Sequence, residues 1–389
     1  MDIRAERKWF LAIPIILALL CLAVPVHAAN VTVSCPGGSA GTYPSITTAL
    51  SAIGVIGPST ITVTGTCNET VGLFNARSIT IVAGAGGATI IGMQGNDAFD
   101  ISLSQDITLG NLEIRGNAAS SSGGGVVIFE NSQVNIVGCN IHDNPDFGVL
   151  VNRDSQAFLR NTTIQNNPGD ALDVHDDSSA DVAGTTIQNN GFGVDVATRS
   201  GVIFRQHNLI LNNGDFGIFA TDSCRVGVLT ADPAFFTTIS GHNVNGIGAG
   251  DQTIVRMEGP HAIQGNGSAC PTDPTCGGIF AIRNATLNLS SANISGNQGS
   301  GIAVEQLADV LLDNTTVSNN TGDGVHIRRI SVAQFIAANT VTGNGGASVS
   351  CDTTSLVVGD LSTFSNIACK QIERPHGPPR PGKPKQPQL

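Results

Sequence analysis

The sequence predicts an all-β protein, a right-handed parallel β-helix solenoid of about 23-residue coils with a short N-terminal capping helix. Three observations predict this fold: asparagine recurs at a fixed spacing, apolar and polar residues alternate beside it, and the composition is rich in turn formers. Of the 389 residues, 47 are glycine and only 13% are charged. This composition is typical of many short strands separated by tight turns.

The repeated asparagine marks one point of each coil and, except at Asn243, follows an Ile or Val by three positions. Most steps are 23 or 24 residues, and two steps of 30 and 31 residues indicate loop insertions. The members of the series are Asn144, Asn167, Asn190, Asn213, Asn243, Asn266, Asn297, Asn320 and Asn344. Asparagines at one point of successive coils are expected to stack and to hydrogen-bond to one another, which is a structural role.

Residues between the asparagines alternate with a period of two, as in Gly148–Val151 and Gly324–Ile327, and this predicts strands. One coil accommodates three short strands, and stacked coils form parallel sheets around an apolar core. A leucine-rich repeat has a similar length but requires a repeated Leu that this chain lacks. The six-residue period of a left-handed hexapeptide helix is not visible at the marker positions.

Residues 1–29 are predicted to be a signal peptide. Basic residues precede an apolar stretch over residues 10–26, and residues 26–28 (Val-His-Ala) form a small-residue cleavage pattern. A membrane anchor is the alternative, but the stretch is short and contains Pro14 and Pro25. We therefore expect export to the periplasm or the extracellular space, with no membrane span after cleavage.

The remaining chain divides into a β-helix domain, residues 30–369, and a Pro-rich basic tail, residues 370–389, which we expect to be disordered. The domain contains 27 Asp and Glu, 11 Arg and no Lys, a net charge of −16. This charge argues against a nucleic-acid partner.

Eight cysteines follow the predicted cleavage site, an even number that favours disulfides in an exported chain. Cys270 and Cys276 bracket a short loop and form one candidate pair. The pairs Cys35 with Cys67 and Cys351 with Cys369 would staple the two ends of the solenoid, one pair at each end. Cys139 and Cys224 are far apart in the sequence and are expected to stay free.

Residues 43–56, within a capping segment of about 35–56, are predicted to form a helix that covers the first coil. Ile46, Ala49, Leu50 and Ile53 are spaced for one helical face, Pro44 fits a first turn and Gly54 fits the end. The segment GTYPSITTALSAI followed by STITVTGTCNETV resembles the opening of the pectin-lyase-like superfamily. That resemblance implies a parallel β-helix, and it leaves the activity open because the superfamily contains enzymes and surface proteins alike.

The candidate site comes from aligning successive coils. One outward-facing column contains Leu150, Asp173, Asp195 and Phe219, so Asp173 and Asp195 should lie one strand spacing apart, with His175 on the same face. Such carboxylates raise each other's pKa and can act as general acid and base, or they can share Ca²⁺. The catalytic candidates are therefore Asp173, His175 and Asp195. The other interpretation is that they are solvated residues of an acidic surface.

Asp170 and Phe219 are predicted to line a substrate groove, because an aromatic ring can stack on a sugar. The insertions near residues 231–236 and 270–276 are expected to project from the coil and to wall a groove along one sheet. The partner would be a polysaccharide or a cell-surface glycan. Because complete catalytic signatures are missing, the sequence favours a non-catalytic extracellular or surface module, binding or structural, that is associated with carbohydrate. The alternative is a polysaccharide-active lyase, hydrolase or esterase.

Overall fold

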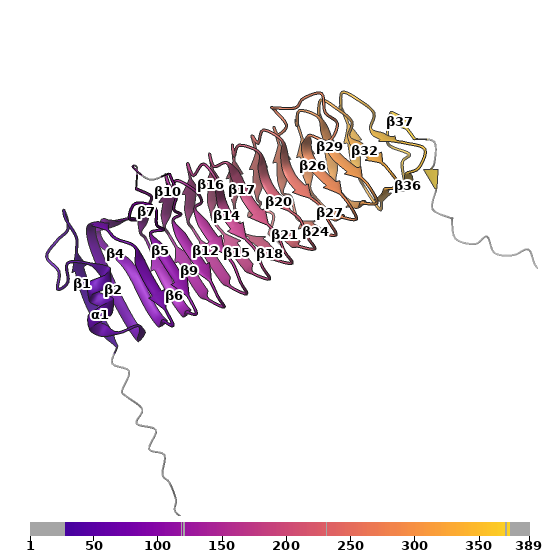
Figure 1. Ribbon diagram of the computed structural model, residues 1–389. Helices are drawn as coiled ribbons and strands as arrows, with labels where there is room; N and C mark the ends of the chain where they lie inside the picture. The colour runs from indigo at the N-terminus through magenta and orange to yellow at the C-terminus, as the bar shows by residue number, and fades with distance from the viewer. Residues whose placement is uncertain (1–27, 118, 120, 231, 370–371, 374–389) are drawn as a thin grey trace, which may run out of the picture.

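The computed structural model describes residues 28–117, 119, 121–230, 232–369 and 372–373. They form one elongated parallel β-solenoid that runs from an N-terminal cap to the C-terminal strands (Figure 1). Nearly all of the predicted signal peptide and basic tail lies outside the described residues. Among the helices that are described, none is long and apolar enough to cross a membrane.

Each coil contributes one strand to a 13-stranded sheet, whose strands all pair in parallel. Its members are β3 (Val71–Phe74), β5 (Phe99–Ser102), β8 (Val126–Phe129), β11 (Val149–Val151), β14 (Asp170–Val174), β17 (Phe192–Val196), β20 (Phe216–Ala220), β23 (Asn245–Ala249), β26 (Gly277–Ile282), β29 (Ser300–Glu305), β32 (Val325–Arg328), β35 (Val349–Cys351) and β37 (Ile367–Ala368).

The other 25 strands form a second parallel sheet with two arms, which the long strand β4 joins because it pairs with a member of each. The first arm contains β1 (Ala29–Ser34), β2 (Ile56–Asn68), β4 (Arg77–Ile91), β6 (Gln105–Gly110), β9 (Gln133–Val137), β12 (Gln156–Arg160), β15 (Ser179–Ala183), β18 (Gly201–Arg205), β21 (Arg225–Leu229), β24 (Ile254–Glu258), β27 (Thr286–Ser290), β30 (Asp309–Asp313), β33 (Val332–Phe335), β36 (Leu356–Gly359) and β38 (Ile372–Glu373). The second contains β7 (Glu113–Arg115), β10 (Asn140–His142), β13 (Thr163–Gln165), β16 (Thr186–Gln188), β19 (Leu209–Leu211), β22 (Thr238–Ser240), β25 (Ala262–Gln264), β28 (Asn293–Ser295), β31 (Thr316–Ser318) and β34 (Thr340–Thr342).

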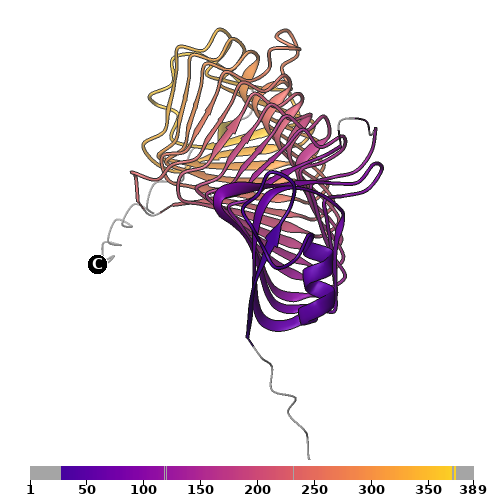
Figure 2. The same cartoon turned by 90° about the vertical axis from the view of Figure 1, so that its left-hand side faces the viewer.

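The core is a continuous column of inward-facing aliphatic side chains. Val149, Leu172 and Val194 stack on successive strands of the 13-stranded sheet and are fully buried. The end-on view shows how the coils enclose this narrow interior (Figure 2). The predicted three-strand coil and the right-handed parallel β-helix are therefore confirmed.

Tight two-residue turns follow the strands of the 13-stranded sheet. In successive coils Asp176 and Asp177, then Thr198 and Arg199, have positive φ angles between 51° and 61°. Asp and Asn tolerate this conformation because their side chains form local hydrogen bonds. The turn after β14 therefore holds two aspartates for a structural reason, although they lie close to the candidate site.

The asparagine stack exists and is buried. The Oδ1 of Asn167 accepts hydrogen bonds from the backbone N–H of Asn144 at 3.0 Å and from its side-chain amide at 2.9 Å. The same pattern links the later members, with one correction. His242, and not Asn243, occupies the stack: its Nδ1 accepts the Asn213 N–H at 3.1 Å. The position requires a buried acceptor, and a neutral imidazole satisfies this requirement as an amide does.

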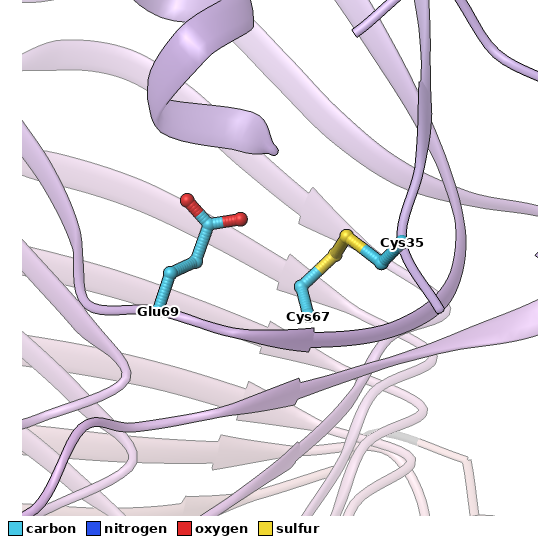
Figure 3. Close-up of side chains that lie close together, drawn as sticks. All are labelled: Cys35, Cys67 and Glu69. Atoms are coloured by element: carbon cyan, nitrogen blue, oxygen red, sulfur yellow. A yellow bond between two sulfur atoms is a disulfide. The ribbon is translucent and has the colours of Figure 1, made fainter. Parts of the chain in front are cut away.

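Helix α1 (Ile46–Ile53) covers the first coil, as predicted, and ends at Gly54, whose φ is 82°. Pro44 does not occupy its first turn: Ser45 is the N-cap and accepts the Thr48 N–H, so the proline lies before the helix. Glu69 completes the cap from the adjacent coil, accepting the N–H groups of Ile46 at 2.9 Å and Thr47 at 3.0 Å (Figure 3).

The three predicted disulfides are present: Cys35–Cys67 beside Glu69 (Figure 3), Cys270–Cys276 and Cys351–Cys369. Cys139 and Cys224 are free and buried, and burial raises the pKa of each thiol to about 11. These two thiols are therefore unreactive core residues.

The two insertions border the second arm of the 25-stranded sheet, and their role as the walls of a groove stays a prediction. Residues 232–237 connect β21 to β22, two strands of the 25-stranded sheet, whereas the loop with Cys270 and Cys276 connects β25 to β26 and borders the 13-stranded sheet. The two loops therefore leave the coil at opposite edges of the second arm, and the second loop alone borders the sheet that carries Asp170 and Phe219.

Candidate functional site

The candidate site lies on the outward face of the 13-stranded sheet, at β14 and β17. Parallel pairing places Asp173 beside Leu150 on one side and Asp195 on the other, and Asp195 beside Phe219. The predicted column of outward residues is therefore present. Asp173 and Asp195 alternate with Val174 and Val196, which are fully buried, so the strand geometry holds the two carboxylates on the surface.

His175 joins the two aspartates. Its Nε2 forms an ion-pair contact with Asp173 Oδ1 and lies 3.9 Å from Asp195 Oδ2. One donor atom from each of the three side chains lies within 4.8 Å of the others. The side chains of Asp173, His175 and Asp195 are 18%, 32% and 25% exposed, so each can reach a ligand and yet is partly shielded from water.

Asp170 is the fourth member of what we call the acid–base cluster: Asp170, Asp173, His175 and Asp195. It begins β14 and pairs with Phe192 on β17. Burial, followed by the negative charges of Asp173 and Asp195, raises the pKa of Asp170 to about 7. A carboxyl group with this pKa is partly protonated at neutral pH and can donate a proton.

The neighbours of Asp170 also have shifted pKa values. Burial and then the charge of Asp173 raise the pKa of Asp195 above its ordinary value. The close contact with the Asp173 carboxylate raises the pKa of His175. Among the described residues, Asp195 Oδ1 is buried and has no hydrogen-bond partner. A polar atom in that state carries a desolvation cost that a bound ligand or a transferred proton would relieve.

Three phenylalanines continue the same face. The rings of Phe192 and Phe216 stack with centroids 5.8 Å apart, and Phe216 and Phe219 meet at 5.0 Å. All three are partly exposed. Gly248 on the next strand makes room for them, because an added Cβ would lie 2.8 Å from the Phe216 ring and 3.0 Å from the Phe219 ring. We call these three rings the aromatic platform.

Phe192 was not identified from the sequence. The observation that could have identified Phe192 is a second column, formed by Asp170, Phe192 and Phe216. This column becomes visible only when β14, β17 and β20 are aligned at their first residues. Phe235 and Phe236 lie in the loop after β21 and do not reach the cluster's sheet. Phe236 packs against His207 instead.

The donor set of Asp173, His175 and Asp195 is compatible with a metal ion, but it contains a nitrogen. Ca²⁺ binds six to eight oxygens, whereas a set of one imidazole and two carboxylates also suits transition metals such as Zn²⁺ or Mn²⁺. Metal binding would require a neutral His175, which its contact with Asp173 opposes. The predicted role of Ca²⁺ stays a prediction.

Cys35, Cys67 and Glu69 also lie close together (Figure 3), but they are not a metal site. The two sulfurs form the disulfide, and both carboxylate oxygens of Glu69 accept N–H groups of α1. These groups are fully used by the cap.

Comparison with known proteins gives a clear match for the fold. A family model described as the right handed beta helix region matches residues 62–231 and 272–372. No curated protein matches the sequence.

Solved structures with a similar fold include three whose names describe polysaccharide chemistry. A double mutant of a periplasmic alginate epimerase is 12% identical, with a TM-score of 0.48 over 82% of this chain and 78% of that chain. The A-module of an Azotobacter vinelandii mannuronan C-5 epimerase is 14% identical, with a TM-score of 0.47 over 86% and 92%. An endo-xylogalacturonan hydrolase from Aspergillus tubingensis is 14% identical, with a TM-score of 0.41 over 88% and 100%. These values are too low to indicate a reaction or a substrate for this chain.

Proposed function

The chain belongs to the right-handed β-helix family, and from that premise we propose that it is an exported enzyme whose acid–base cluster transfers protons on a bound polysaccharide. The observation that carries the proposal is the set of two carboxylates and one imidazole within 4.8 Å, with Asp195 Oδ1 buried and unpartnered among the described residues. Three disulfides agree with an oxidising compartment.

The cluster supplies both a proton donor and a proton acceptor. Asp170, with its pKa raised to about 7, retains its proton in a fraction of molecules at neutral pH. The pKa of Asp195 rises less than that of Asp170, and the Asp195 carboxylate is the proton acceptor. The positive charge of protonated His175, between Asp173 and Asp195, stabilises negative charge at that acceptor. Groups whose environments separate their pKa values are typical of acid–base catalysis.

The aromatic platform gives the polysaccharide a place to bind. Apolar faces of sugar rings stack on exposed aromatic rings, while polar neighbours bind the hydroxyl groups. Phe219 pairs with Asp195 in register, so a sugar on Phe219 would place the next residue of its chain over the cluster. Asp170 and Phe219, the predicted groove residues, thus act as proton donor and sugar platform in this proposal.

A second function, a non-catalytic carbohydrate-binding module, has one observation in its favour. A hollow of about 660 Å³ lies on the other sheet, on strands β12, β15, β18, β21 and β24, and no residue of the acid–base cluster lines it. An exposed aromatic platform also serves binding alone.

The test is to incubate the exported protein with neutral and acidic polysaccharides, with EDTA, Ca²⁺ or Zn²⁺. Unsaturated products, reducing ends, released esters and epimerised sugars are scored. The proposal expects one of these products, and expects Asp195→Asn to remove it. Asp215→Asn, which changes an exposed aspartate in the turn before β20, is the matched control and should retain activity. Activity that survives in Asp195→Asn, or a folded protein inactive on every substrate, would favour the binding module.

A further inference from the structure

The sheet that carries no part of the acid–base cluster has a feature of its own. On the outward face of the first arm, β12, β15, β18, β21 and β24 lie side by side (Figure 1) and form a hollow of about 660 Å³. Its floor includes Gly201 and Gly227, where the strands present no side chain. We call this hollow the arginine hollow because of the residues that border it.

The walls of the arginine hollow are apolar. Phe158, Ile203 and Leu229 border it, together with Ile254, which is 41% exposed. Large hydrophobic side chains that remain exposed around a concave surface are typical of binding sites. The apolar walls therefore indicate a ligand that has apolar faces.

The border of the hollow is positively charged. Arg205, Arg225 and Arg256 line it, and all three are exposed. Arg205 pairs with Asp181 at 3.0 Å, and Arg256 hydrogen-bonds to Glu258 at 2.6 Å. Arg225 has no ion pair among the residues that the structure describes.

Arg160, beside the hollow, is held by Asp181 at 3.1 Å and lies over the Phe158 ring. With it, four of the 11 arginines of residues 30–369 gather on this face, opposite two carboxylates, Asp181 and Glu258. The face is thus net positive on a domain whose charge is −16. A local excess of the minority charge favours an anionic ligand.

We propose that the arginine hollow binds an acidic oligosaccharide, a chain of carboxylated sugars, at a site separate from the acid–base cluster. The hollow crosses five parallel strands, a span of about 19 Å at ordinary strand spacing. Sugar C–H faces pack on Ile203, Leu229 and Ile254, and a carboxylate binds Arg225, whose guanidinium is free to form a bidentate pair.

Other occupants fit less well. Nucleic acid requires many phosphate contacts, and the strongly acidic remainder of the domain repels it. The C-terminal tail carries Lys and Arg, so the arginines repel that segment as well. An acidic sugar chain combines the low charge density and the apolar faces that this hollow can accommodate.

The test is isothermal titration calorimetry of the exported protein with hexagalacturonate, and with neutral cellohexaose as comparison. We expect hexagalacturonate to bind at least about tenfold more tightly, with an affinity that falls as salt rises. Arg225→Gln should weaken binding about tenfold, because it removes a charge-assisted hydrogen bond.

Gly227→Val provides a second variant that does not depend on charge. A Cβ added at Gly227 would lie 3.4 Å from Leu229 and 3.6 Å from Ile203, so valine fits the strand and fills the hollow. It should also weaken binding about tenfold or more. Arg283→Gln, which breaks the ion pair with Asp251 at the other sheet's turn, is the matched control and should leave binding unchanged.

Asp195→Asn separates this proposal from the proposed enzyme. Hexagalacturonate binding that is unchanged in Asp195→Asn and weakened in both Arg225→Gln and Gly227→Val supports the arginine hollow, whether or not the cluster is catalytic. Binding lost in Asp195→Asn but kept in Arg225→Gln overturns it. Absent binding of hexagalacturonate, or equal affinity for cellohexaose, also overturns it.

Discussion

Two clusters on the same sheet use similar side chains and reach opposite electrostatic states. On β14 and β17, Asp173, His175 and Asp195 lie together; on β32 and β35, His326 and Ser350 occupy the same outward column, with Asp323 just before β32. Asp323 Oδ2 lies 2.9 Å from His326 Nδ1 and accepts the Ser350 hydroxyl, and Asp323 Oδ1 accepts the Ala347 N–H at 2.7 Å.

The pKa values record the difference. Burial alone would raise the pKa of Asp323, but the hydrogen bonds from His326 and Ser350 outweigh it, and the pKa falls below its usual value. At Asp195 the interactions that lower the pKa do not outweigh burial, so the pKa rises. The lesson is that an Asp–His pair on a sheet is not in itself reactive. The cluster whose carboxylates remain incompletely partnered is the better candidate for chemistry.

The largest expected effect is on catalysis. Asp195→Asn keeps the shape of the side chain but removes the proton acceptor, and it should lower activity by at least about 100-fold. Ser350→Ala, at the hydrogen-bonded cluster on the same column, should leave activity within about twofold. Initial rates on the substrate found in the polysaccharide panel measure both. Equal losses in the two variants would show that the clusters do not differ in function.

The next effect concerns stability against pH. The pKa of Asp170 rises from 3.8 unfolded to about 7 folded, so the unfolded chain releases this proton first as pH increases. The contribution of Asp170 to the free energy of unfolding is therefore full below about pH 4 and lost as pH rises through about 7, by about 4 kcal/mol at most.

Asp170→Asn removes this loss and should stabilise the protein at pH 8 relative to pH 4. Urea unfolding followed by circular dichroism at both pH values measures the change. Asp323→Asn should instead destabilise the protein at pH 8 relative to pH 4. Folding lowers the pKa of Asp323, so this carboxylate stabilises the fold at pH values above its unfolded pKa, and that stability is lost in acid. A pH-independent effect of Asp170→Asn would contradict the assigned pKa.

A smaller effect is expected on the pKa of His175. The close contact of its Nε2 with the Asp173 carboxylate is the first cause of its raised pKa, and burial opposes the rise. Asp173→Asn should therefore lower the pKa of His175 to its ordinary value or below it, as measured by an NMR titration of the imidazole signals. Ser350→Ala should not move this titration. An unchanged pKa in Asp173→Asn would mean that the ion pair is not formed in solution.

The smallest effect is expected from Ser350→Ala on Asp323. The variant removes one hydrogen bond to the carboxylate, which should raise the pKa of Asp323 and destabilise the fold by about 1 kcal/mol at neutral pH. Ser350→Thr keeps the hydroxyl and is the matched control. NMR titration and urea unfolding measure the two changes, and a shift of similar size in Ser350→Thr would exclude the hydrogen bond as its cause.

Several parts of the molecule could be predicted because repetition fixes them. In a solenoid each coil lies on the last one, so a spacing of 22 or 23 residues specifies which residues are neighbours, as Leu150, Asp173 and Asp195 are. The same logic identified the asparagine stack. It failed at His242, because the stack selects a buried acceptor at one backbone position and the inserted loop obscured which residue occupies it.

The sequence by itself determined the coil, the cap, the three disulfides and the column that contains Asp173 and Asp195, because these depend on period, spacing and short-range chemistry. Only the tertiary structure decided that Asp195 Oδ1 is left without a hydrogen-bond partner among the described residues while both oxygens of Asp323 are bonded, and that Arg225 borders a hollow with a floor of glycine. Hydrogen-bond satisfaction and surface shape depend on side-chain directions and distances across coils, and a small difference in either reverses the sign of a pKa shift.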